Sequence, residues 1–477
     1  MPDFPQSICR FGIARCDITP PVGIYHRLWG AASHNQATGI HRPLTATAMV
    51  FAPAAAESQE QVLVAADHCL LWAGEMNALL QALASRTGLS REQIAVTFSH
   101  THSAGLIGLE RSNLPGGELI APYLESLTER IGDIIEQARD TVELATIGYG
   151  SGHCPLAAQR DYWDEGTGQY VCGTNPAAKA DDTVLVTRVT SADGSLLATV
   201  VNYACHPTTL AWQNTLLSPD FPGAMREVIE NATEAPCVFL QGASGDLGPR
   251  DGFVGDVETA DRNGRQLGYA ALAALESLPP PLTRFTYTGP VVSGATLGTW
   301  AHVPLAETDL DRLKTWQLRR WTIDLAYRAD LPTLEQTKSE QQSWLEREER
   351  ARSVGQLQEA SDCRAMVERM TRRLTRLQDL PPGPSFPFPV TLWRMGDAFW
   401  LAVEAELYQH FQIALRQHFA GTPIVLATLT NGSRPSYLPT ADVYGKGIYQ
   451  ESIAVLAPGC LEKLLDEIRG QIHKWAD

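Results

Sequence analysis

Strand and helix patterns alternate in the stretch from Gln61-Val-Leu-Val-Ala-Ala-Asp67, through residues 72–85, to Gln93-Ile-Ala-Val-Thr-Phe-Ser99. The first and last segments are short apolar runs typical of buried strands, and residues 72–85 have helical spacing. Another apolar run precedes them at residues 46–52, and residues 121–141 form a long amphipathic pattern. This alternation predicts a layered α/β (α+β) fold with a mixed β-sheet core flanked by helices.

The same kind of pattern continues along most of the chain. We expect a helix around residues 224–232, and strands at residues 146–150, 182–190, 196–204, 235–241, 390–393, 399–403 and 424–428. Residues 306–378 differ, because they are rich in Arg, Glu, Gln and Leu and have apolar positions at helical spacing. We therefore predict a main domain formed by residues 1–300 and 381–477, with an inserted helical hairpin at 306–378. We expect the hairpin to be a packing or oligomerisation element, and the alternatives are a substrate lid or a nucleic-acid-binding arm.

Composition limits the functional classes. Of the 477 residues, 44% are hydrophobic and 19% are charged, which is enough apolar material for a large core. The net charge of −16 argues against non-specific binding to nucleic acid. No apolar run reaches the roughly 18–20 residues of a membrane span, and the first residues do not have the pattern of a signal peptide. Nine scattered cysteines without a C-x-x-C pair favour reduced thiols in a cytoplasmic protein and argue against a cysteine-bound zinc.

Metal-competent side chains follow several apolar strands. His100 and His102 lie in Ser99-His-Thr-His-Ser103, and His206 follows the apolar run 197–201. Glu404 and Glu406 stand where an apolar strand gives way to a helical pattern. Imidazole and carboxylate groups are common zinc ligands. These residues could equally be hydrogen-bonded core histidines and carboxylates placed at a helix N-terminus.

Two loops are less informative on their own. Gln241-Gly-Ala-Ser-Gly-Asp-Leu-Gly-Pro249 has neither the lysine of a phosphate-binding loop nor the G-x-S-x-G pattern, so Ser244 is a weak nucleophile candidate. Asp220, in Leu216-Leu-Ser-Pro-Asp220, is expected to cap the following helix.

Taken in order, five segments resemble the neutral/alkaline non-lysosomal ceramidase family. The segments are Gly12-Ile-Ala-Arg-Cys-Asp-Ile-Thr-Pro-Pro-Val-Gly23, Ser99-His-Thr-His-Ser103, Cys205-His-Pro-Thr-Thr209 with Leu217-Ser-Pro-Asp220, Val403-Glu-Ala-Glu406, and Tyr437-Leu-Pro-Thr440 with Tyr449. Together they span about residues 10–275 and 385–455.

The resemblance implies a Zn²⁺ site and a set of groups around the scissile amide. The family's zinc ligands correspond to His100, His206, Glu406 and Tyr437. Its groups near the amide correspond to His102, Arg160 and Tyr449. The implied activity is hydrolysis of a linear amide, or N-acyl, bond by metal-activated water.

Several departures from the family pattern change the expected substrate. The family has a loop G-D-V-S-P-N whose serine is important for ceramidase activity. In this sequence the loop reads Gly245-Asp-Leu-Gly-Pro-Arg250, so Gly248 replaces that serine and excludes a serine nucleophile at this position. The 306–378 insertion is extra, and we find no match to the C-terminal immunoglobulin-like domain of larger members. We therefore expect a small-molecule substrate that is smaller or more polar than ceramide. The same residues would also suit a metal-dependent esterase or lactone hydrolase, or a non-catalytic binding protein that keeps the metal scaffold.

Overall fold

Two β-sheets dominate the computed structural model, in which residues 4–55 and 59–476 are described. In spatial order, the strands of the larger sheet are β13 (Cys237–Gln241), β11 (Leu196–Tyr203), β10 (Thr183–Ser191), β6 (Glu143–His153), β1 (Gln6–Asp17), β3 (Thr45–Pro53), β4 (Gln61–Ala66) and β5 (Ile94–Phe98). The strands of the smaller sheet are β17 (Trp316–Ala326), β18 (Ser385–Met395), β19 (Ala398–Val403) and β21 (Ile424–Ala427). Both sheets are mixed, because β11–β13, β4–β5 and β19–β21 are parallel pairs and the other neighbours are antiparallel.

The two sheets pack face to face around a shared apolar layer. Within the larger sheet, the ring centroid of Phe51 lies 5.3 Å from that of Phe11. Across the layer, it lies 5.2 Å from the ring centroid of Trp400 in the smaller sheet. Met49 and Val425 belong to the same buried cluster. Burial of this much apolar surface between the sheets is the main force that holds them together.

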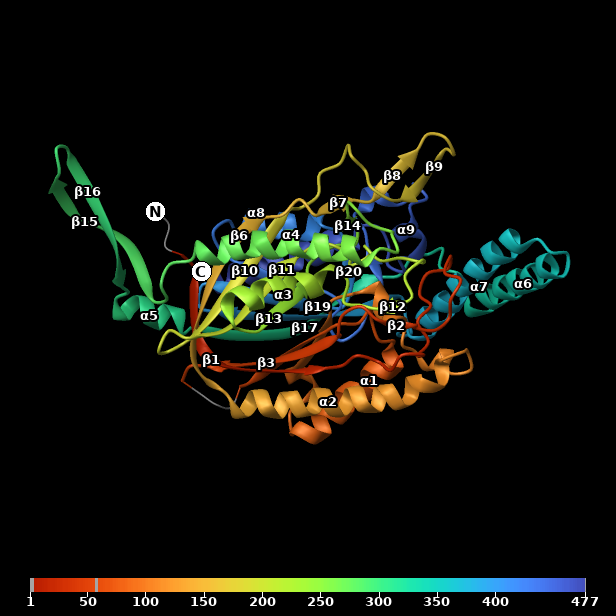
Figure 1. Ribbon diagram of the computed structural model, residues 1–477, viewed down its shortest axis with the longest axis horizontal. Coiled ribbons are helices and arrows are strands. Elements are labelled where there is room, and N and C mark those ends of the chain that lie inside the picture. Colours follow the sequence, from red (N-terminus) through yellow and green to blue (C-terminus); the bar gives the residue numbers. More distant parts are fainter. Residues whose placement is uncertain (1–3, 56–58, 477) are drawn as a thin grey trace.

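Helices cover the outer faces of both sheets (Figure 1). They are α1 (Ala73–Thr87), α2 (Ile120–Asp140), α3 (Phe221–Thr233), α4 (Val257–Glu276), α8 (His410–His418) and α10 (Cys460–Ala476). Helices α1 and α2 share a buried cluster with β3, β4 and β5, whereas α3 and α4 share one with β10, β11 and β13. Helices α8 and α10 pack on the smaller sheet. The predicted layered fold, with a mixed sheet core flanked by helices, is confirmed.

The first part of the predicted insertion, residues 306–378, does not have the expected helical structure. Two long helices separated at residues 329–332 were expected within 306–378, but the helical segments are α5 (Glu307–Leu313), α6 (Leu334–Ser353) and α7 (Leu357–Gln378). Residues 316–326 instead form β17, which pairs with β18 along its whole length and buries Ile323 and Leu325 in the core. The helical hairpin therefore begins at Leu334, and deleting all of 306–378 would remove a strand of the smaller sheet.

Two protrusions extend from opposite ends of the molecule (Figure 1). One is the α6–α7 hairpin, and the other is a ribbon formed by β15 (Thr283–Val292) and β16 (Thr296–Pro304). The remaining short strands form four pairs: β2 (Gly39–Ile40) with β12 (Leu216–Leu217), β7 (Ala157–Gln159) with β14 (Leu247–Pro249), β8 (Asp161–Asp164) with β9 (Gln169–Cys172), and β20 (Glu406–Leu407) with β22 (Tyr437–Leu438). Within residues 4–55 and 59–476, no helix has the length and apolar character needed to cross a membrane.

Helix α7 is fixed against the body of the protein by a buried ion pair. The Arg111 guanidinium is almost fully buried, pairs with Glu368 of α7, and also donates to the Tyr25 hydroxyl at 3.2 Å. Close packing adds to this contact, because a Cβ atom at Gly30 would lie 2.8 Å from the Cβ of Ala365. Separating the partners of a buried ion pair is strongly destabilising. The pair therefore holds the middle of α7 against the body of the protein.

Candidate active site

The candidate site lies where the carboxyl ends of parallel strands from both sheets meet. His100 follows β5, His206 follows β11, and Glu406 follows β19. Direct hydrogen bonds hold these strand ends together: the Thr97 hydroxyl donates to the Thr428 carbonyl at 2.7 Å, and the Thr428 amide donates to the Gln241 carbonyl at 3.0 Å. Carboxyl ends of parallel strands are the usual place for functional residues in such sheets.

Two imidazoles and one carboxylate converge there. The Nε2 atoms of His100 and His206 lie 3.2 and 3.0 Å from the same oxygen, Glu406 Oε2. All three side chains are buried, and their ligand atoms lie within 4.8 Å of one another. In a tetrahedral zinc site, each ligand atom lies about 2.0–2.1 Å from the metal. The ligand atoms of such a site are separated from one another by distances similar to those between these histidine nitrogens and the glutamate oxygen. The donor set therefore fits a metal ion of this kind.

The other ring nitrogen of each histidine is fixed by a backbone carbonyl. His100 Nδ1 donates to the carbonyl of Cys69 at 2.7 Å, and His206 Nδ1 donates to that of Ser244 at 2.7 Å. These bonds select the tautomer whose Nε2 lone pair is available, which is the usual arrangement around metal-binding histidines. His100 has a φ angle of +68°, a backbone conformation that is uncommon for a residue other than glycine. Such strain is concentrated at functional sites.

The electrostatics of the cluster keep the carboxylate ionised. Burial alone would raise the pKa of Glu406, but His100 and His206 hold it well below its usual range. Burial opposes protonation of His100, yet Cys69 and Glu406 raise its pKa. Burial and the charge of Arg160 lower the pKa of His206 to about 3. Glu406 and His206 are therefore in the ionised and neutral forms that bind metal ions, whereas His100 would release a proton when a metal ion binds.

Tyr437 is the direct neighbour of Glu406 across the β20–β22 strand pair. Its ring stacks on that of His206 with 6.2 Å between centroids, and its hydroxyl accepts a 3.0 Å hydrogen bond from Arg160 Nη2. The same Arg160 nitrogen donates to the Gly245 carbonyl at 2.7 Å, while its buried Nε has no partner among the described residues. Tyr437 and Arg160 thus border the cluster.

Glu404 faces away from the cluster. Its two carboxylate oxygens accept hydrogen bonds of 2.6 Å from the Arg434 side chain. Of the two glutamates that follow β19, only Glu406 belongs to the group of converging ligand atoms. Asp220 caps α3 by accepting from the Phe221 amide at 2.6 Å, as predicted.

His102 borders the cluster without joining its hydrogen bonds. Its ring lies 5.0 Å from that of His100 and 6.0 Å from that of His206. Both ring nitrogens are buried, and neither has a hydrogen-bond partner within the described part of the chain. Burial and the neighbouring His100 charge place the pKa of His102 well below its usual range. A neutral imidazole with two unused nitrogens is suited to exchange a proton with a ligand.

Aromatic residues lie around the candidate site. Tyr449, at the start of α9 (Tyr449–Ile453), is 43% exposed, and its ring lies 6.1 Å from that of Tyr437. Trp29 packs on His102 at 5.1 Å and on Phe253 at 5.6 Å. Sequence patterns did not identify Trp29, nor the backbone carbonyls of Cys69 and Ser244 that orient the histidines. Backbone acceptors leave no signature in residue types, so no pattern would have found those carbonyls.

Comparisons with known proteins agree with this fold. The family model described as "Neutral/alkaline non-lysosomal ceramidase, N-terminal" matches residues 9–249. A structure titled "Ceramidase complexed with C2" is similar with a TM-score of 0.64 and 17% identity, covering 97% of this chain and 74% of that one. The neutral ceramidase from Pseudomonas aeruginosa is similar with a TM-score of 0.63 and 17% identity, covering 97% and 73%. At this identity the structural likeness establishes a shared fold alone. None of the curated proteins matches.

Proposed function

This chain belongs to the neutral/alkaline non-lysosomal ceramidase family, and from that premise we propose that it is a zinc-dependent amidohydrolase. It would cleave a linear amide, or N-acyl, bond with water as the nucleophile. The observation that carries the proposal is the convergence of His100 Nε2, His206 Nε2 and Glu406 Oε2 on one buried point.

The residues that would hold zinc are His100, His206, Glu406 and Tyr437. When bound, zinc supplies Lewis-acid polarisation of the amide carbonyl and a lower pKa for water. Tyr437 lies beside Glu406. Burial raises the pKa of Tyr437 well above its usual range, and the charge and hydrogen bond of Arg160 oppose that rise. Two imidazoles and a carboxylate, with a phenol oxygen beside them, make a suitable donor set for this ion.

The remaining residues of the site handle the substrate and its protons. We assign His102 to proton transfer toward the leaving amine, because its two ring nitrogens are buried and unpaired within the described residues. We assign Arg160 and Tyr449 to the developing negative charge on the carbonyl oxygen, since both lie beside Tyr437.

A serine nucleophile is not part of this mechanism. Gly248 has no side chain, and it lies in β14 next to Thr208 and Arg160. The remaining serine in this loop, Ser244, places its Oγ 2.5 Å from Gln241 Nε2 and 3.2 Å from His206 Nδ1. That position is on the side of the His206 ring opposite the nitrogen that faces Glu406.

We further propose that the substrate is smaller or more polar than ceramide, in line with the loss of the loop serine. All nine cysteines are free thiols, which supports a reducing, cytoplasmic location. Contact with a second copy of the chain through residues 306–378 stays a prediction. The exposed Val354 and Leu357 at the tip of the hairpin are the part of this segment suited to it.

A substrate panel tests the proposed activity. We expect purified protein with bound zinc to hydrolyse short N-acyl amines faster than the matched esters and lactones. Faster turnover of esters or lactones would instead indicate a metal-dependent esterase. Zinc binding without turnover of any member would indicate a metal scaffold that has lost catalysis.

A further inference from the structure

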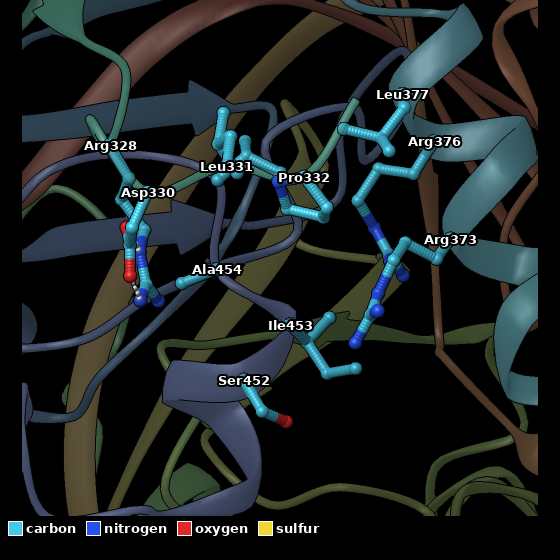
Figure 2. Close-up of a pocket in the computed structure, with 11 residues that line it drawn as sticks. Arg328, Asp330, Leu331, Pro332, Arg373, Arg376, Leu377, Ser452, Ile453 and Ala454 are labelled. Atoms are coloured by element: carbon cyan, nitrogen blue, oxygen red, sulfur yellow. Dashed lines mark hydrogen bonds and ion pairs between the residues drawn. The ribbon is translucent and has the colours of Figure 1, made fainter. Parts of the chain in front are cut away.

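A cavity of about 230 Å³ lies between the inserted hairpin and the segment that follows Tyr449 (Figure 2). Arg373 and Arg376 of α7 reach into it from one side, and Arg328 and Asp330 lie on the other. Ser452 of α9 also lines it. The hairpin therefore contributes one wall of a cavity beside the candidate active site.

The charges around this cavity do not balance. Arg328 is neutralised by Asp330, with hydrogen bonds of 2.8 and 2.6 Å. Arg373 pairs with Glu340 at 3.1 Å. Arg376 makes no side-chain hydrogen bond or ion pair with any described residue, and its Nε is buried. An unpaired charge in such a place is costly, so the cavity presents a guanidinium that lacks an anion.

The cavity adjoins the candidate active site. Tyr449, Ser452 and Ile453 are spaced i, i+3 and i+4 on α9, so they share one face of this helical turn. The last two line the cavity, and the first lies 6.1 Å from Tyr437. Burial lowers the pKa of Arg376, and the charges of Tyr449 and Glu406 oppose that shift.

We propose that Arg376 binds an oxyanion of the substrate, a carboxylate or a phosphate, remote from the bond that is cleaved. The planar guanidinium of arginine matches both groups with two parallel hydrogen bonds. The substrates would then be amides that carry an acidic group, a class consistent with a substrate more polar than ceramide. This assignment rests on the proposed amidohydrolase function. It gives the α6–α7 hairpin the task of selecting the substrate.

Matched substrates test the anion site. The panel consists of N-acylated amino acids and dicarboxylic acid monoamides of several chain lengths, each beside its neutral carboxamide and its phosphate analogue. We expect kcat/KM to favour an acidic member over its carboxamide by about 10-fold or more, the size of a charge-assisted hydrogen bond. In Arg376→Gln this ratio should fall by about 10–100-fold, and Arg376→Lys should recover part of it. Arg350→Gln, on the exposed part of α6, is the matched control and should keep the ratio.

Binding to zinc-free protein separates this proposal from the proposed function. Calorimetry with the same acids should detect binding to the wild type and to Arg350→Gln, and much weaker binding to Arg376→Gln. Binding of this kind without turnover would preserve the anion site and reject the amidohydrolase. Equal turnover of acidic and neutral amides, or an equal loss for both in Arg376→Gln, would overturn the anion site and leave the amidohydrolase standing.

Discussion

Replacing His206 by alanine is expected to abolish amide hydrolysis and to remove the metal. His206 is fully buried, and its Nε2 is one of three atoms that define the proposed zinc position. Removing a residue that only hydrogen-bonds to a metal ligand typically lowers metal affinity or activity by about 10–100-fold. Removing a ligand itself should therefore lower kcat/KM by more than about 10³-fold. Elemental analysis of the purified variant, beside a circular dichroism spectrum, separates lost metal from lost folding.

Ser244→Ala is the matched control for this variant. Both residues belong to the same hydrogen-bond group, but the principal acceptor of His206 Nδ1 is the Ser244 backbone carbonyl, which the substitution keeps. We expect a loss below about tenfold, or 1.4 kcal/mol of transition-state stabilisation. A loss as large as that of His206→Ala, or an acyl group trapped on Ser244 in mass spectra, would mean that a serine carries the reaction.

Replacing Tyr449 by phenylalanine is expected to lower kcat by about 10²–10³, the usual loss for one oxyanion donor. The Tyr449 hydroxyl has no hydrogen-bond partner among the described residues, and its half-exposed ring lies beside that of Tyr437. Phenylalanine keeps the ring contact, so zinc content should stay at the wild-type level. Single-turnover measurements at saturating substrate report the change in the chemical step.

Tyr444→Phe controls for the loss of a tyrosine hydroxyl in the same loop. That hydroxyl donates to the Leu456 carbonyl at 2.8 Å, away from the metal ligands. We expect its kcat to match the wild type. An unchanged kcat in Tyr449→Phe would exclude a role for this hydroxyl in the transition state.

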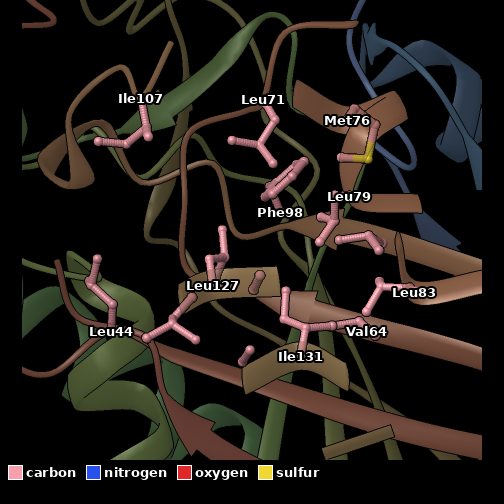
Figure 3. Close-up of a cluster of buried hydrophobic side chains, with 14 of the residues drawn as sticks. Leu44, Val64, Leu71, Met76, Leu79, Leu83, Phe98, Ile107, Leu127 and Ile131 are labelled. Atoms are coloured by element: carbon pink, nitrogen blue, oxygen red, sulfur yellow. The ribbon is translucent and has the colours of Figure 1, made fainter. Parts of the chain in front are cut away.

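Segments with strong local periodicity could be predicted from the sequence. Helical spacing within residues 72–85 indicated a helix, and in the structure Met76, Leu79 and Leu83 of α1 belong to one buried cluster with Val64 and Ile131 (Figure 3). The spacing of such residues is set by the helix itself. No knowledge of distant parts of the chain was needed.

The first part of the insertion was wrongly predicted because its periodicity is mixed. Trp316, Trp321 and Leu325 are four or five residues apart, which favoured a helix. In the structure, Trp321, Ile323 and Leu325 alternate with Thr322 and Asp324 in the two-residue period of a strand. Trp321, Ile323 and Leu325 pack on one buried cluster, and Trp316 and Leu318 lie partly buried against another. Arg319 and Asp324 are exposed, as charged residues of a solvated helix would be.

The metal-competent residues were identifiable because each follows an apolar strand, and the family resemblance placed them in order. Their convergence depends on how two sheets pack, which no local pattern specifies. Arg376 had no sequence signal at all, because an arginine in a charged helix resembles a solvated side chain. Its position follows from tertiary contacts such as the buried Arg111–Glu368 pair.

A zinc titration of metal-free protein tests the central claim most directly. Protein stripped with a chelator is titrated with Zn²⁺, and hydrolysis of the best N-acyl amide is measured against zinc bound per chain. We predict no turnover without metal, a linear rise to about one ion per chain, and a plateau beyond it. Full activity of the metal-free protein, or activity that does not follow bound zinc, would contradict the account.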